Sequence, residues 1–133
     1  MAAAITEHVI PEDPSNDPDH PIPFLRVIDV AGYRKDGGAN LSIVVASPID
    51  GSTHSQTRLL DKIEAYLSFI GSPDYLESAG APPSPSLTTI EVLLHPDSSE
   101  EIRSLLSRCN QWVHSSHASL VVRDLTVDEL GST

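Results

Sequence analysis

Several short groups of residues in this sequence carry side chains that could do chemistry. His114 and His117 are separated by two serines, a spacing that would place both imidazoles on one side of a helix end and that metal ions accept. Metal sites usually need three or four ligands, and the nearby sequence offers no third one. Histidine at a helix C-terminus also interacts favourably with the helix dipole, and we favour this interpretation.

The segment Asp50-Gly51-Ser52-Thr53-His54-Ser55 brings an acid, hydroxyls and a histidine together where a helix is expected to start. Free backbone N–H groups at such a start can hold an anion, and a hydroxyl beside a histidine could form a nucleophile–base pair. Such a pair needs a fixed geometry that adjacent loop residues rarely provide. Helix capping explains the same residues, so we expect capping here rather than catalysis.

Cys109 is the one cysteine, which excludes an internal disulfide and a cysteine pair for zinc. It falls on the apolar face of a predicted helix, where we expect it to pack as a small hydrophobic residue. Glycine-rich phosphate loops and the HExxH and GxSxG motifs are absent from the sequence. The sequence therefore predicts no catalytic residue, no cofactor and no metal site.

Asp29 is the one polar residue in the apolar stretch from Val27 to Val30. It could be a buried functional carboxylate. Because buried carboxylates need partners, we prefer a position on an open sheet face or an ion pair with a nearby base. The candidate bases are Arg26, Arg34 and Arg123.

A β-hairpin and a helix make up the first half of the predicted domain. Residues 24–34 and 40–47 are rich in β-branched types and flank a glycine turn, which predicts two antiparallel strands. The next apolar positions follow helical spacing and predict a helix over residues 55–70, with Ser52 or Thr53 as its cap. These positions are Leu59, Leu60, Ile63, Tyr66, Leu67 and Ile70.

A long loop, a strand, a helix and a last strand make up the second half of the predicted domain. Residues 71–86 are rich in proline and serine, which predicts a loop with at most one short turn at 74–78. Residues 87–95 alternate as a strand does. Ser98 and Glu101 form a capping-box pattern before a helix that extends to Val113, and residues 118–125 predict the last strand.

These elements predict an α/β (α+β) two-layer sandwich with the order β-β-α-β-α-β. Right-handed crossovers give a mixed four-stranded sheet in the order 1-2-3-4, with the first strand antiparallel and both helices on one face. The other face is half polar and should be open in the monomer. Val44, Leu93 and Val121 lie on it and are the candidate interface residues.

The net charge of −11 is concentrated at the chain ends. Residues 1–23 combine prolines with acidic residues and contain no Lys or Arg, which predicts a disordered tail before a single domain over residues 24–125. The tail could contact the domain near Ile22–Pro23. Residues 126–133 should be a flexible C-terminal end. The acidic balance argues against nucleic acid and anionic membranes as partners. No signal-peptide pattern is present, so we expect a cytoplasmic protein.

The hairpin beginning at Val27-Ile28-Asp29 and the helix Leu59-Leu60-Asp61-Lys62-Ile63-Glu64-Ala65-Tyr66-Leu67-Ser68-Phe69-Ile70 resemble a family of small bacterial proteins of unknown function. The resemblance covers roughly residues 27–122. This chain has a longer acidic tail and a 71–86 loop richer in proline and serine. The resemblance implies a compact cytoplasmic bacterial domain, and it implies no catalytic residues.

Two functions from different classes remain open. The first is a non-catalytic protein-interaction or accessory module, with a protein partner or a second copy on the open sheet face. The alternative is a small enzyme or ligand-binding domain. Its site would lie at the carboxyl ends of the strands, near His54, His95 and Asp97.

Overall fold

A short connection that contains Gly37 and Gly38 joins the first two strands. The computed structural model describes residues 15–35 and 37–130. Strands β1 (Val30–Tyr33) and β2 (Ala39–Val45) pair in antiparallel register, which confirms the predicted hairpin. Gly37 and Gly38 have φ angles of 102° and 95°, a region that side chains rarely adopt. A Cβ on Gly38 would also overlap the carbonyl oxygen of Leu87, so the turn requires glycine there.

Two parallel strands complete the sheet. Strand β3 (Thr88–Leu94) pairs with β2, and β4 (Ser119–Asp124) pairs with β3. The resulting order is β1-β2-β3-β4, with β1 as the antiparallel member. The predicted α/β class, mixed four-stranded sheet and strand order are therefore confirmed.

The helices are more numerous than predicted. The first long helix is α2 (Thr53–Ile70), as expected, and Ser52 caps it by accepting the N–H of Ser55. The second predicted helix is divided into α4 (Glu100–Ser107) and α5 (Asn110–Ser115), with Ser99 rather than Ser98 as its cap. A short helix, α6 (Val127–Leu130), follows β4. None of the described helices combines the length and apolar character needed to cross a membrane.

The segment predicted as a loop contains a helix, α3 (Pro73–Ala79). Ser72 accepts the N–H of Tyr75, and Pro73 occupies the first turn, where its missing N–H costs nothing. Gly80 ends the helix in the left-handed conformation. The prolines and glycine that suggested a loop are thus the start and stop signals of a helix of two turns.

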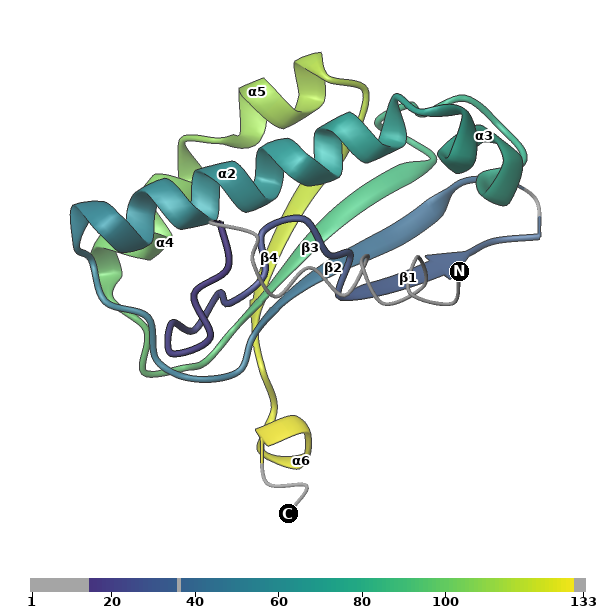
Figure 1. Ribbon diagram of the computed structural model, residues 1–133. Coiled ribbons are helices and arrows are strands. Elements are labelled where there is room, and N and C mark those ends of the chain that lie inside the picture. Colours follow the sequence, from purple (N-terminus) through teal and green to yellow (C-terminus); the bar gives the residue numbers. More distant parts are fainter. Residues whose placement is uncertain (1–14, 36, 131–133) are drawn as a thin grey trace, which may run out of the picture.

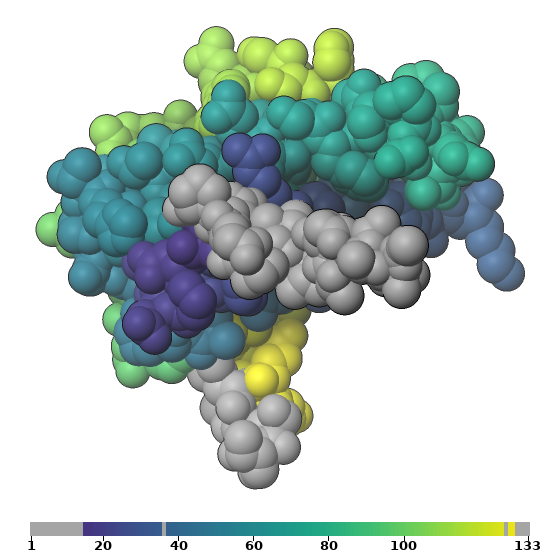
Figure 2. Space-filling view, in the orientation of Figure 1, coloured from purple at the N-terminus to yellow at the C-terminus, as the bar shows by residue number. Residues whose placement is uncertain are grey.

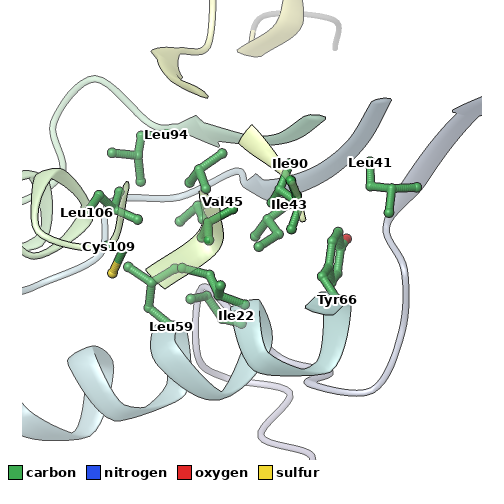
Figure 3. Packing of buried hydrophobic residues seen from close by; sticks show 14 of the residues in the cluster. Ile22, Leu41, Ile43, Val45, Leu59, Tyr66, Ile90, Leu94, Leu106 and Cys109 are labelled. Carbon is green, nitrogen blue, oxygen red and sulfur yellow. The ribbon is translucent and has the colours of Figure 1, made fainter. Parts of the chain in front are cut away.

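The core lies between the sheet and the helices α2, α4 and α5, which Figure 1 shows on the same side of the sheet. Figure 3 shows side chains of α2, such as Leu59 and Tyr66, directed towards β2 and β3. The alternate strand residues that meet them are fully buried. They are Leu41, Ile43 and Val45 of β2 and Ile90, Val92 and Leu94 of β3.

The chain before β1 packs against α2. Figure 2 shows the segment that begins at residue 15, in purple, lying against the start of this helix. Ile22 is 2% exposed and belongs to the core. The predicted tail over residues 1–23 lies outside the described residues as far as residue 14. Residues 15–23 are part of the packed structure, so packing begins before residue 24.

Candidate functional site

The acid and hydroxyls singled out at residues 50–55 form a connected cluster at the start of α2. Asp50 Oδ1 accepts the Ser55 hydroxyl at 2.7 Å and the N–H of Ser52 at 3.1 Å. His20 Nε2 lies 2.9 Å from Ser55 Oγ. The sequence did not associate His20 with this segment, because it lies 35 residues away in the predicted tail. Asp50, Ser55 and His20 together have the residue types of an acid–serine–histidine relay.

The direction of the hydrogen bonds decides what this cluster can do. The N–H of Ile22 donates to His20 Nδ1 at 2.9 Å, so Nδ1 carries no proton and neutral His20 donates from Nε2 to Ser55. Ser55 in turn donates to Asp50. A general base must accept the hydroxyl proton of the nucleophile, which His20 does not do here. Ser55 is also buried, so the cluster acts as a structural cap.

The protonation preferences agree with this assignment. Burial, followed by the charge of Arg58, lowers the pKa of His20 and keeps the ring neutral. Hydrogen bonds from Ser55 and Ser52 lower the pKa of Asp50 to about 2, which makes it a weak base. The hydrogen bond from His54 lowers the pKa of Asp17, and His54 Nε2 lies 3.1 Å from Asp17 Oδ2. His20 and His54 meet edge to face, with ring centres 5.2 Å apart.

His95 and Asp97 are at the end of β3, as the alternative function required. His95 Nδ1 accepts the N–H of Asp97 at 3.0 Å, and the N–H of His95 donates to Val45 O. His54 instead lies beside Asp17 and His20. Each histidine is thus held by its own neighbours, and the two are not joined by any interaction that the described residues show.

The histidine pair at the end of α5 has the structure of a helix terminus. His117 has a φ of 73°, so the chain reverses there, and its N–H donates to the carbonyl of His114 at 3.1 Å. Within residues 15–35 and 37–130, no three His, Cys, Asp or Glu side chains gather as metal ligands would. Cys109 is buried, donates from Sγ to Leu105 O at 3.3 Å, and has a pKa raised by burial.

Asp29 forms an ion pair, but its partner is Lys62 and none of the three arginines considered from the sequence. Lys62 Nζ lies 2.9 Å from Asp29 Oδ1, although the lysine side chain is only 2% exposed. The same ammonium donates to the carbonyls of Phe24 and Val27. The other oxygen of Asp29 accepts the N–H of Val44 at 2.9 Å. This carboxylate therefore connects the start of β1 to both α2 and β2.

Arg58 and Tyr66 extend this arrangement along α2. Arg58 donates to the carbonyls of Ile22 and Pro23, at 2.8 and 3.1 Å. Tyr66 accepts the N–H of Asp29 at 2.7 Å and donates to Ser42 O at 2.6 Å. Arg58, Lys62 and Tyr66 are spaced by four residues and share one helix face. We call these three residues the polar row. The apolar spacing of the helix gave no sign of its two cations.

The polar row also explains why the first strand is shorter than predicted. The carbonyls of Phe24 and Val27 bind Lys62, and the N–H of Asp29 binds Tyr66. These backbone groups are therefore directed to α2 instead of β2. Pairing with β2 begins only at Val30.

The predicted interface residues differ in accessibility. Strand register places Val30, Ser42, Glu91 and Val121 in one row across the sheet face opposite the core. Val121 is 43% exposed, Val44 is half-buried and Leu93 is only 8% exposed. The centre of this face is polar, since Ser42 and Glu91 occupy the two middle strands.

Two exposed valines lie next to each other on the edge strand β4. Strand β4 pairs with β3 on one side, and its neighbouring residues Val121 and Val122 are 43% and 38% exposed. Val121 lies on the open face and Val122 on the helix side. Beside them, a hollow of about 460 Å³ lies between α5 and β4. Its lining residues are Asn110, Gln111, His114, Ser119 and Leu120.

Protein-family models, curated proteins and solved structures were each compared with this chain, and none of them matches it.

Proposed function

We propose that this chain is a protein-interaction module without a reaction of its own, and that its contact surface is centred on Val121. We further infer that α2 and the pair α4 and α5 cover the same sheet face, so that the face of Val121 stays open. The observation that carries the proposal is the edge strand β4, which pairs with β3 and exposes two adjacent valines. Exposed apolar side chains gathered on an open edge mark contact surfaces in small domains.

The clusters that could do chemistry support the same proposal. The Ser55 hydroxyl donates to Asp50, His20 donates to Ser55, and the Lys62 ammonium binds three oxygens of its own chain. These groups hold the start of α2 and the segment before β1 in place. A family relationship to the small bacterial proteins that the helix resembles, and a cytoplasmic location, stay part of the proposal.

Photo-cross-linking in the cells that encode the chain tests the contact surface. A photoreactive phenylalanine analogue would replace Val121 in one variant and Leu76 in the control. Leu76 is 50% exposed and lies on α3, a different part of the surface. We expect a covalent protein adduct of defined mass from position 121 and none from position 76. No adduct from position 121, or the same adducts from both positions, would overturn the proposal.

A further inference from the structure

We propose that β4 pairs in antiparallel fashion with β4 of a second copy of this chain, with Val121 on the two-fold axis. The inference rests on the proposed function, since it names the partner of the same edge. The pairing would join two four-stranded sheets into one continuous sheet. Isologous contacts of this kind are the commonest way in which identical chains form dimers.

The backbone groups of β4 point alternately to β3 and away from it, and among the described residues no strand pairs with the outer edge. The N–H of Leu125 donates to Leu94 O at 2.7 Å, so the backbone groups of residue 125 point to β3. Because these directions alternate along a strand, the backbone groups of Leu120, Val122 and Asp124 point away from the sheet. A second strand can reach them without displacing any bond to β3.

The side chains select one register. In a symmetric antiparallel pair, either Val121 or Val122 faces its own copy. With Val121 on the axis, Leu120 faces the partner's Val122, and every central pair is apolar. With Val122 on the axis, Leu120 would face the partner's Asp124 and Val121 the partner's Arg123. Apolar pairs stabilise a strand pairing, so the first register is preferred.

The hollow beside α5 fits that register. Leu120 and Val122 point to the helix side, because their β3 partners Ile90 and Val92 are in the core. Leu120 lines the hollow together with Asn110 and His114 of α5. The partner's Val122, placed opposite Leu120, would enter this space. The same contact occurs twice in the symmetric dimer, which adds apolar packing to the backbone bonds of the two strands.

The other sheet edge is less suited to pairing. Strand β1 has four residues, includes Gly32 and is followed by Arg34 and Lys35. Short strands and flanking cations are common protections of an edge. The one cation of β4, Arg123, is held at 3.1 Å from Glu91 and 2.9 Å from Glu129. Residues 119–122 of β4 contain neither a charge nor a proline.

Sedimentation velocity on the full chain over a range of concentrations tests the dimer. It should be run at about 0.15 M salt, where repulsion between two acidic chains is screened. We expect a monomer–dimer equilibrium whose dissociation constant rises about 100-fold or more in Val122→Asp, because pairing would bury an unpaired charge. Val30→Asp is the control, because Val30 lies on the opposite edge strand and is 51% exposed against 38% for Val122, and it should leave the dissociation constant unchanged.

A cysteine at the axis tests the register. Val121→Cys should form a disulfide-linked dimer under mild oxidation, because directly opposite Cα atoms in such a pair lie within disulfide range. Val122→Cys should not. Urea unfolding of both variants confirms that they are folded. A wild-type monomer at all concentrations, an unaffected dimer in Val122→Asp, or cross-linking of Val122→Cys alone would overturn the inference. A cellular adduct from position 121 to a different protein would overturn it too, yet leave the interaction module standing.

Discussion

At the scale of single residues, the unusual feature is a buried cation whose partners are mostly backbone oxygens. Lys62 has two carbonyls and the Asp29 carboxylate as acceptors, so its three donors are all used. Burying such a charge is unfavourable unless each donor is satisfied. The irregular segment before β1 supplies those acceptors, and it is held in place by the same bonds.

Replacing Lys62 by methionine should therefore destabilise the fold although the side-chain volume hardly changes. The substitution leaves the Asp29 carboxylate and two carbonyls without their donor, and we expect a loss of about 3 kcal/mol in the free energy of unfolding. Urea denaturation measures it. Lys35→Met is the control, since Lys35 is exposed and should cost less than about 0.5 kcal/mol. A Lys62→Met protein as stable as this control would contradict the account.

His20 should make stability depend on pH near neutrality. Its folded-state pKa lies below the ordinary 6.5, so the unfolded chain takes up the proton first as the pH falls. The contribution of neutral His20 is complete above pH 6.5 and is lost as the pH drops through this value towards the folded-state pKa. Protonation also removes the acceptor of the Ile22 N–H.

Urea unfolding of wild type and His20→Gln at a series of pH values measures this contribution. The difference between the two curves should shrink as the pH falls below 6.5. Gln111→Asn, an exposed substitution on α5 that removes no titrating group, is the control and should run parallel to wild type. The same parallel behaviour in His20→Gln would rule out the proposed role of His20.

At the scale of elements, apolar periodicity was sufficient for the sheet and the long helix. Alternation in β2 and β3 and the spacing of Leu59, Ile63 and Tyr66 correspond to buried positions. The short helix α3 was missed because proline and glycine mark both loops and helix ends. The polar row was missed for a different reason. A lysine on an apolar face is ordinarily read as solvent-exposed, and its acceptors come from a segment more than thirty residues away.

The sequence predicted what the residues at the start of α2 do, but it did not predict which distant residues bind them. Capping by Ser52 follows from its position before a helix, and the structure confirms it. His20 could not be associated with Ser55 from the sequence, since no local pattern links a proline-rich segment to a helix start. Tertiary packing likewise determines the partner of Asp29, because it places the Lys62 ammonium, and not one of the three arginines, next to the carboxylate.

The hairpin turn gives a prediction at this scale. Gly38→Ala combines a left-handed backbone with an overlap against Leu87 O. Gly80→Ala at the end of α3 has a similar φ, but its Cβ would meet nothing within 4 Å. We expect about 1 kcal/mol of destabilisation for Gly80→Ala and at least about 2 kcal/mol more for Gly38→Ala. Thermal unfolding of both variants measures the difference, and equal costs would show that the turn relaxes freely.

At the scale of the whole molecule, composition and packing divide the chain differently. Proline and acidic residues set residues 1–23 apart from the rest of the sequence. The packing instead includes Ile22 in the core and ties the carbonyls of Ile22 and Pro23 to Arg58. A few buried groups are sufficient to attach a segment whose average composition is that of a tail.

Two truncated chains, beginning at residues 15 and 24, test where the folded unit begins. The longer one keeps Ile22 and the acceptors of Arg58, and the shorter one leaves an apolar vacancy beside an unpaired guanidinium. Burial of one isoleucine is worth about 2–3 kcal/mol, so the shorter chain should unfold at a clearly lower urea concentration. Ile22→Ala in the full chain should lose about 2–4 kcal/mol by the same cause. If both truncated chains unfold together and Ile22→Ala is neutral, residues 15–23 contribute nothing to the fold, and the boundary at residue 24 predicted from composition is the correct one.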